Sequence, residues 1–231
     1  MNVGRSGILL LLLALGASCT TTYQARHVPT SGFLGDYSQL RPGRAGEPKL
    51  VYFNPAADIR DYEQILIDPI AGYLGKGSRL NKLSAKDRQA LLDYFQTTLR
   101  EQLGRDYKIV DRPGPGVLRL RVGLTDAKGT KPVLDTLSTV TPIGLAISAL
   151  ERVTLGKTLT TGSVRIEAEA LDGRTGERLA AMVDERVGAK VTGRFDKWSK
   201  WQDARDAFDY WAARMQTTLQ TFRERAANAA P

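Results

Sequence analysis

Apolar and polar residues alternate along the stretch Val117-Leu-Arg-Leu-Arg-Val-Gly-Leu-Thr125, and this alternation decides the fold. A period of two is typical of a strand whose two faces meet different surroundings, since successive side chains point to opposite sides. The same period recurs over 164–170. Together the two stretches predict a sheet with one apolar and one charged face. The apolar face would carry Leu118, Leu120, Val122, Leu124, Val164, Ile166, Ala168 and Ala170, and the charged face Arg119, Arg121, Arg165, Glu167 and Glu169.

A hairpin turn is predicted directly after the second strand, at Asp172-Gly-Arg-Thr-Gly176. Beyond it, Leu179, Ala181 and Val183 are expected to continue the apolar face on a further strand. Shorter strands are expected elsewhere, because short apolar runs are bounded there by turn-forming residues. They cover 50–53, 65–67 and 107–110.

Amphipathic helices are predicted where apolar residues recur at steps of three and four. The first begins at Ser84, with Asp87 as the acid of a capping-box-like start, and ends at Gly104. The last begins at the capping box Ser199-Lys-Trp-Gln202 and runs to about Arg225. Their apolar stripes are Leu91, Leu92, Phe95, Leu99 and Leu103 in the first, and Trp201, Ala204, Phe208, Trp211, Met215, Leu219 and Phe222 in the last.

The expected order of elements is ββαββ(α)ββα, in which the bracketed helix belongs to an ambiguous insert. This order predicts an α+β fold, with a mixed or mostly antiparallel sheet and two main helices packed on one face as a two-layer sandwich. The insert contains 136–150, which carries no charged residue. We expect a helix packed on the core there; an exposed flap that meets a partner or the bilayer is the alternative.

The first 18 residues have the layout of a bacterial export signal. Arg5 gives a positive start, 8–15 is apolar, and small residues follow up to Ser18. The apolar run is too short to span a bilayer. Cys19 follows directly, and the lipoprotein pathway requires a cysteine there for cleavage after Ser18 and for acylation of its thiol. We therefore expect lipid attachment at Cys19; a soluble secreted protein is the alternative.

Thr20 stands directly after the cysteine, where an Asp would favour retention in the inner membrane. By analogy with Gram-negative sorting, the expected location is the outer membrane, facing the periplasm. Phe33, Leu34 and Tyr37 are expected to pack onto the domain as a clasp, with a partner-docking peptide as the alternative. The chain is expected to divide into a signal peptide at 1–18, a lipidated tether at 19–31, a single α+β domain at 32–226 and a disordered tail at 227–231.

The available chemistry is narrow, because Cys19 is the sole cysteine of the chain and His27 the sole histidine. His27 lies in the predicted tether, so neither a histidine-based triad nor a zinc site is expected in the folded part. No metal and no cofactor is expected. Neighbouring carboxylates leave one enzyme hypothesis open, an acid/base pair acting on envelope glycans, although solvated loop acids are the simpler interpretation. They are Asp58, Asp61, Glu63 and Asp68.

The chain carries 33 basic and 25 acidic residues, a formal charge of +8, which favours anionic partners. Nucleic acid is not expected for an exported, membrane-tethered domain. The remaining partners are anionic lipid, peptidoglycan or another envelope protein. Basic runs are candidate surfaces for such a partner, a solvated rim being the simpler interpretation. The first contains Lys76, Arg79, Lys82, Lys86 and Arg88, and the second Arg186, Lys190, Arg194, Lys197 and Lys200.

Several stretches follow one another in a recognisable order: Ser31-Gly-Phe-Leu-Gly-Asp-Tyr37, Ile65-Leu-Ile-Asp-Pro69, Gly114-Pro-Gly-Val-Leu-Arg-Leu-Arg121, Ala170-Leu-Asp-Gly-Arg-Thr-Gly-Glu177 and 198–212. Their order and spacing resemble a proteobacterial lipoprotein family, the domain of unknown function number 3313. The resemblance spans about 31–225. It implies an exported lipoprotein and supplies no activity and no functional residue.

These features predict a non-enzymatic accessory or binding module of the cell envelope, held on the outer membrane through its N-terminal lipid. Two alternatives stay open. One is a carboxylate-based enzyme that acts on envelope glycans. The other is a structural subunit of an envelope transport assembly.

Overall fold

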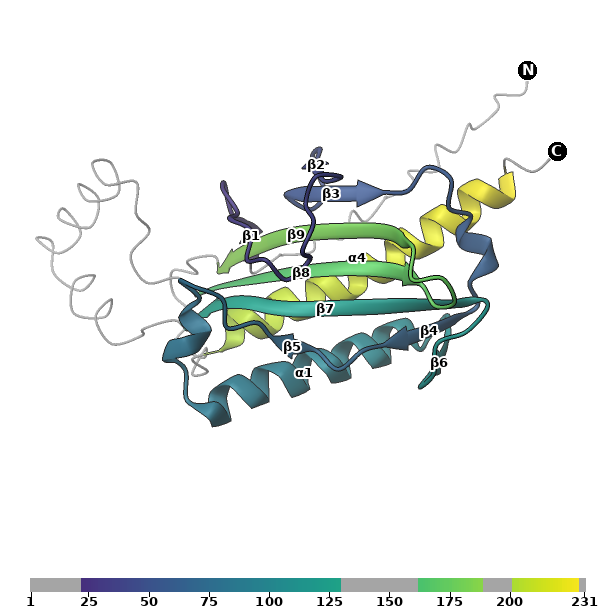
Figure 1. Cartoon of the computed structure of the whole chain (residues 1–231). Helices are drawn as coiled ribbons and strands as arrows, with labels where there is room; N and C mark the ends of the chain where they lie inside the picture. The colour runs from purple at the N-terminus through teal and green to yellow at the C-terminus, as the bar shows by residue number, and fades with distance from the viewer. Residues whose placement is uncertain (1–21, 130–161, 189–200, 229–231) are drawn as a thin grey trace, which may run out of the picture.

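A mixed sheet of nine strands with helices on one face forms the part of the chain that the computed structural model describes, residues 22–129, 162–188 and 201–228 (Figure 1). The α+β class is thus confirmed. No helix within these ranges is both long and apolar enough to cross a membrane. The strands are β1 Thr22–Gln24, β2 Arg41–Pro42, β3 Leu50–Phe53, β4 Gln64–Ile67, β5 Ala71–Gly72, β6 Lys108–Val110, β7 Val117–Lys128, β8 Ser163–Asp172 and β9 Arg178–Gly188.

The long strands β7, β8 and β9 form the antiparallel centre of the sheet, in which Val122 lies opposite Ala168 and Ala168 opposite Met182. Short strands extend both sides. β1 and β3 pair with different parts of β9, whereas β4 and β5 run parallel to β7. The order β2-β3-β9-β8-β7-β4-β6 is therefore mixed. β1, β2 and β5 are absent from the expected order, because two or three residues are too few to show a period.

The helices α1 (Ala85–Leu103) and α4 (Gln202–Asn228) pack against each other on the apolar face (Figure 1). The Ser84 side chain accepts a hydrogen bond from the Asp87 N–H, so the predicted cap of α1 is confirmed. The rings of Phe95 and Phe208 stack with their centroids 4.4 Å apart, and both side chains are fully buried. Short 3-10 turns, η1 (Ile59–Asp61) and η2 (Arg79–Lys82), complete the described elements.

The apolar face of β9 differs from the prediction. Ala181 and Val183 lie on the side away from the helices, in a cluster with Leu34, whereas Met182 packs against the helix-side core. The cause is a bulge in the β8–β9 ladder, whose register shifts between Ala170 and Leu171. An extra residue in one strand reverses the alternation beyond it, because side chains alternate with a period of two.

The predicted tether also differs from the structure. Thr22–Gln24, inside the expected tether 19–31, forms strand β1 and pairs with the end of β9. The folded part therefore starts at least as early as Thr22. The signal peptide, Cys19, the insert 136–150 and the start of the last predicted helix at Ser199 lie outside the described residues.

Candidate functional site

The charged face of the sheet is covered by the segment Ala25 to Leu40, which we call the cover segment. Leu34 is buried against Ala181 and Val183. The Phe33 ring lies so close to Gly123 that a Cβ on that glycine would stand 2.6 Å from the ring. Gly123 therefore interrupts the alternation of β7 to admit Phe33. The expected packing of the clasp residues is confirmed.

Glu167 of β8 lies beneath the cover segment and is completely buried, with 0 % of its surface exposed. Its carboxylate accepts hydrogen bonds from the Ser31 N–H at 2.6 Å and from the Tyr37 Oη at 2.5 Å. Burial, together with the bond to Glu167, raises the pKa of Tyr37 above its usual value. A buried carboxylate is costly unless it is paired, so these donors tie the cover segment to the sheet.

Glu169, the next charged residue along β8, is held by two arginines. It pairs with Arg121 of β7 and with Arg178 of β9, whose guanidinium lies 2.8 Å from the carboxylate. Arg178 also donates to the Leu34 carbonyl at 2.9 Å and to the Asp36 carbonyl at 2.8 Å. The same guanidinium thus neutralises a buried acid and holds the cover segment in place.

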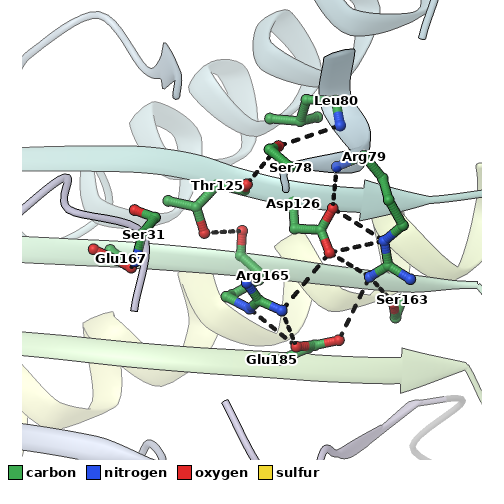
Figure 2. A network of polar contacts seen from close by, with 10 residues as sticks. All are labelled: Ser31, Ser78, Arg79, Leu80, Thr125, Asp126, Ser163, Arg165, Glu167 and Glu185. Atoms are coloured by element: carbon green, nitrogen blue, oxygen red, sulfur yellow. Dashed lines mark hydrogen bonds and ion pairs between the residues drawn. The ribbon is translucent and has the colours of Figure 1, made fainter. Parts of the chain in front are cut away.

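A second charged cluster, the strand-end network, lies further along these strands (Figure 2). Asp126 of β7 accepts from the Arg79 N–H at 2.8 Å and also pairs with the guanidinium of Arg79. Glu185 of β9 pairs with Arg165 of β8 at 2.9 Å, and Arg165 reaches Asp126 at 3.7 Å. Two acids and two bases alternate, so the network balances its own charge. This arrangement favours a structural role.

Strand β1 is fixed by a buried arginine. Arg186 donates from Nε to the Thr22 Oγ1 at 2.7 Å and from its terminal nitrogen to the Thr22 carbonyl at 2.5 Å. Its guanidinium lies 3.6 Å from the centre of the Tyr210 ring. Burial lowers the pKa of Arg186 from its usual value. Gln24 donates to Asp184 at 2.7 Å and adds a second link.

The first basic run is divided by the structure. Lys76, Lys82 and Lys86 are exposed, whereas Arg79 belongs to the strand-end network. Arg88 is partly buried. From the second run, Arg186 is buried beside β1 and is no surface residue. The others, Lys190, Arg194, Lys197 and Lys200, lie outside the described residues and stay predictions, as does Cys19 with Ser18.

The predicted acidic group does not form one site. Asp58 caps η1 and pairs with Arg60, whereas Asp68 pairs with Arg119 at 2.8 Å. Asp61 and Glu63 are exposed. Each paired carboxylate thus has a local structural partner. Within the described ranges, no group of three or more histidines, cysteines or acids is arranged to hold a metal ion.

An apolar pocket of 170 Å³ lies between the sheet and the second half of α4, and the sequence did not predict it. Leu120, Leu179, Met215 and Phe222 contribute to its walls. Asp184 adds a polar group and accepts a hydrogen bond from the Trp211 Nε1 at 2.9 Å. Burial raises the pKa of Asp184 above its usual value. Apolar pockets with a few polar groups are the usual form of small-molecule sites. The sequence feature that accounts for this pocket is a set of small residues in β8 and β9 that face larger side chains on α4. The small residues are Ala168, Ala170 and Ala180.

Solved structures with a similar arrangement share little sequence with this chain. The PelC dodecamer from Paraburkholderia phytofirmans is 13% identical, with 74% of this chain and 94% of that chain covered and a TM-score of 0.40. Protein XCC0632 from Xanthomonas campestris, assigned to DUF330, is 10% identical, with 77% and 94% covered and a TM-score of 0.42. A minor lipoprotein from Acinetobacter baumannii is 16% identical, with 74% and 97% covered and a TM-score of 0.30.

The sequence itself has no significant match among curated proteins. A family model does match, over residues 29–215, which include the cover segment from Pro29 onward, the strands from β2 to β9, and the first half of α4. This range is well over half of the 231 residues. The chain therefore belongs to the family described as Protein of unknown function (DUF3313).

Proposed function

We propose that this protein is a lipoprotein of the outer membrane, facing the periplasm, which serves the cell envelope as a binding or accessory module without enzymatic activity. The observation that carries the proposal is the position of Cys19, three residues before the buried Thr22 that opens the sheet. An export signal followed by a cysteine supplies the anchor. Several acyl chains on that cysteine would hold the domain durably, where a single chain gives only marginal attachment.

The charges of the sheet support a binding module over a catalyst. Glu167 is hydrogen-bonded to the cover segment, and Glu169 is paired with arginines. Asp126 and Glu185 are paired with the arginines of the strand-end network. A general acid or base must instead reach a substrate. The apolar pocket beside α4 is the concave surface that we assign to ligand binding.

Substitution of the cysteine tests the anchor. Cys19→Ala removes the thiol that would be acylated, so we expect no incorporation of labelled palmitate and loss of the protein from the outer-membrane fraction. Thr21→Ala, which leaves Cys19 in place, is the matched control and should behave as the unaltered chain. Unchanged palmitate labelling and fractionation in Cys19→Ala would refute the anchor.

A second substitution tests the destination. Thr20→Asp places an acid directly after the cysteine, and by the sorting analogy it should shift the acylated protein to the inner-membrane fraction. Palmitate labelling should stay unchanged, because the cysteine is intact. If the Thr20→Asp protein still fractionates with the outer membrane, the proposed sorting signal is wrong even though the anchor stands.

A further inference from the structure

Four strand ends meet at one end of the sheet, which we call the anchor end. Thr22 lies opposite Gly188 at the end of β9, and Lys128 at the end of β7 lies opposite Ser163. Ser163 in turn lies opposite Val187. Figure 1 shows that η2 and the beginning of α1 lie at this same end. The strand that follows Cys19 along the chain is therefore part of a broad edge of the domain.

The length of chain between Cys19 and this edge is short. Three Cα–Cα steps separate Cys19 from Thr22, and at about 3.6 Å each they span at most about 11 Å. A flexible tether of 12 residues, as the sequence suggested, would reach on the order of 20 Å. The Debye length in physiological salt is about 8 Å. The observed start of β1 therefore confines Thr22 to within about one and a half Debye lengths of the lipid-bearing cysteine, whereas a 20 Å tether would allow more than two.

The anchor end exposes apolar side chains. Among the described residues, Tyr23 and Leu74 are the exposed large hydrophobics, with 45% and 48% of their surfaces accessible. Tyr23 belongs to β1, and Leu74 follows β5 where the Tyr73 N–H donates to the Leu124 carbonyl at 2.9 Å. Tyr23 lies opposite Val187 at the anchor end, and Leu74 lies on the segment that runs from β5 toward η2 at that end (Figure 1). An aromatic and an aliphatic side chain exposed beside an anchor fit the interfacial region of a bilayer.

Among the residues that the structure describes at the anchor end, the exposed charged side chains are cationic. Lys76 precedes η2, Lys82 ends it, Lys86 lies in the first turn of α1, and Lys128 ends β7. All four are exposed. Of the described acids there, Asp126 pairs with Arg79, and Asp203 accepts from the Gly162 N–H at 3.2 Å. Asp87, beside Lys86 in the first turn of α1, is partly buried. The lysines therefore dominate the charge that the described part of this end presents.

We infer that the anchor end rests on the surface of the membrane that holds the lipid, with Leu74 and Tyr23 at the interface and Lys76, Lys82, Lys86 and Lys128 against anionic head groups. The inference rests on the proposed lipid anchor. The domain then stands end-on, so that the long strands β7, β8 and β9 run roughly perpendicular to the plane of the bilayer. The opposite end, where Asp111 follows β6, points toward the periplasm.

A single fluorescent label tests this orientation in the acylated full-length protein. Cys19 is the sole cysteine and its thiol is consumed by the lipid, so a new cysteine is a unique labelling site. An environment-sensitive dye is attached to the cysteine of Leu74→Cys, and the labelled protein is reconstituted into vesicles. The vesicles contain phosphatidylethanolamine with one quarter phosphatidylglycerol, and a quencher is attached to the lipid head groups. We expect a blue-shifted, strongly quenched emission.

The matched control is Asp111→Cys, whose native side chain is 90% exposed at the opposite end. Its label should emit as in water and escape the quencher. Equal emission and quenching from the two sites would overturn the inference. Failure of the proposed anchor is distinguishable, because the protein would then not float with the vesicles at all.

Lysine variants test the charge. A lysine close to an anionic surface strengthens attachment by about fivefold, so Lys82→Ala should lower the docked-to-undocked ratio of the Leu74→Cys label by up to about fivefold. Lys108→Ala, an exposed lysine on β6, should leave the ratio unchanged. High salt and vesicles without phosphatidylglycerol should mimic Lys82→Ala. Quenching that is insensitive to Lys82, salt and lipid charge would refute the role of anionic head groups.

Discussion

Tyr37→Phe removes one hydroxyl that joins the cover segment to the sheet. That hydroxyl donates to Glu167 at 2.5 Å, and the Ser31 N–H is the other donor that this carboxylate receives from the cover segment. Because Glu167 is completely buried, water cannot take over the lost bond. The same hydroxyl also accepts from the Gly32 N–H at 2.7 Å and from the Leu34 N–H at 3.3 Å. Because the ring is retained, the substitution removes these three hydrogen bonds together and leaves the packing of the ring in place.

The expected cost follows from the charge on the acceptor. A hydrogen bond to a charged group contributes about 1.5–3 kcal/mol, against about 1 kcal/mol for a neutral pair. We therefore expect Tyr37→Phe to lower the free energy of unfolding by about 2 kcal/mol. Glu167→Gln removes the charge and should cost a similar amount. If Tyr37 and Glu167 stabilise the fold through their shared hydrogen bond, the double variant should lose less free energy of unfolding than the two single variants added together. The difference should be about 1 kcal/mol or more.

The assay is equilibrium unfolding in urea with the slope compared between variants, since an unchanged slope means that only stability has changed. Tyr52→Phe is the control, because Tyr52 packs against the same Leu34 cluster and its hydroxyl makes no hydrogen bond within the described part of the chain. It should change the free energy of unfolding by less than about 0.5 kcal/mol. A Tyr37→Phe effect as small as the control, or strictly additive variants, would refute the reasoning.

Two further predictions concern the turn and the cover segment. The Thr175 N–H, with further donors, lowers the pKa of Asp172 to about 2, so its stabilising effect is present above the unfolded pKa of about 4 and is lost as the pH falls toward 2. Asp172→Asn should flatten that part of a stability-versus-pH curve, and an unchanged curve in this variant would contradict the assignment. Gly123→Ala places a Cβ 2.6 Å from the Phe33 ring and should destabilise the protein by about 1–3 kcal/mol in thermal or urea unfolding. Phe33→Ala combined with it should be no less stable than Phe33→Ala alone, and a further loss of the full Gly123→Ala cost would show that the clash lies elsewhere.

The central strands could be predicted because their alternation is long and uninterrupted. β7 and β8 follow the pattern that begins at Val117, and α1 follows the apolar stripe that ends at Leu103. β9 was misjudged from Ala181 onward, because a bulge leaves no clear mark in a run of small apolar residues. β1 was missed altogether, since the three residues Thr22–Gln24 contain no apolar pair and gain their stability from Arg186 far along the chain.

The clasp was predictable in part. Phe33, Leu34 and Tyr37 are apolar or aromatic residues in an otherwise polar stretch, which favours packing. The part of the sheet that they contact was not predictable, because Glu167 is 130 residues from Tyr37 in sequence and the charges of β8 have the pattern of a solvated face. Gly123 was the available clue, since a glycine inside a strand often marks the close approach of another group.

Hydrogen exchange of the peptide that spans 22–26 in the membrane-bound protein tests the central claim most directly, because the short reach of the anchor depends on β1. The Ala25 N–H donates to the Glu185 carbonyl at 2.8 Å, and β1 pairs with the end of β9. We predict that this peptide exchanges far more slowly than an unstructured chain of the same sequence, and that Arg186→Met accelerates it. Exchange at the unstructured rate in the unaltered protein would mean that the anchor is a long tether and would contradict the account.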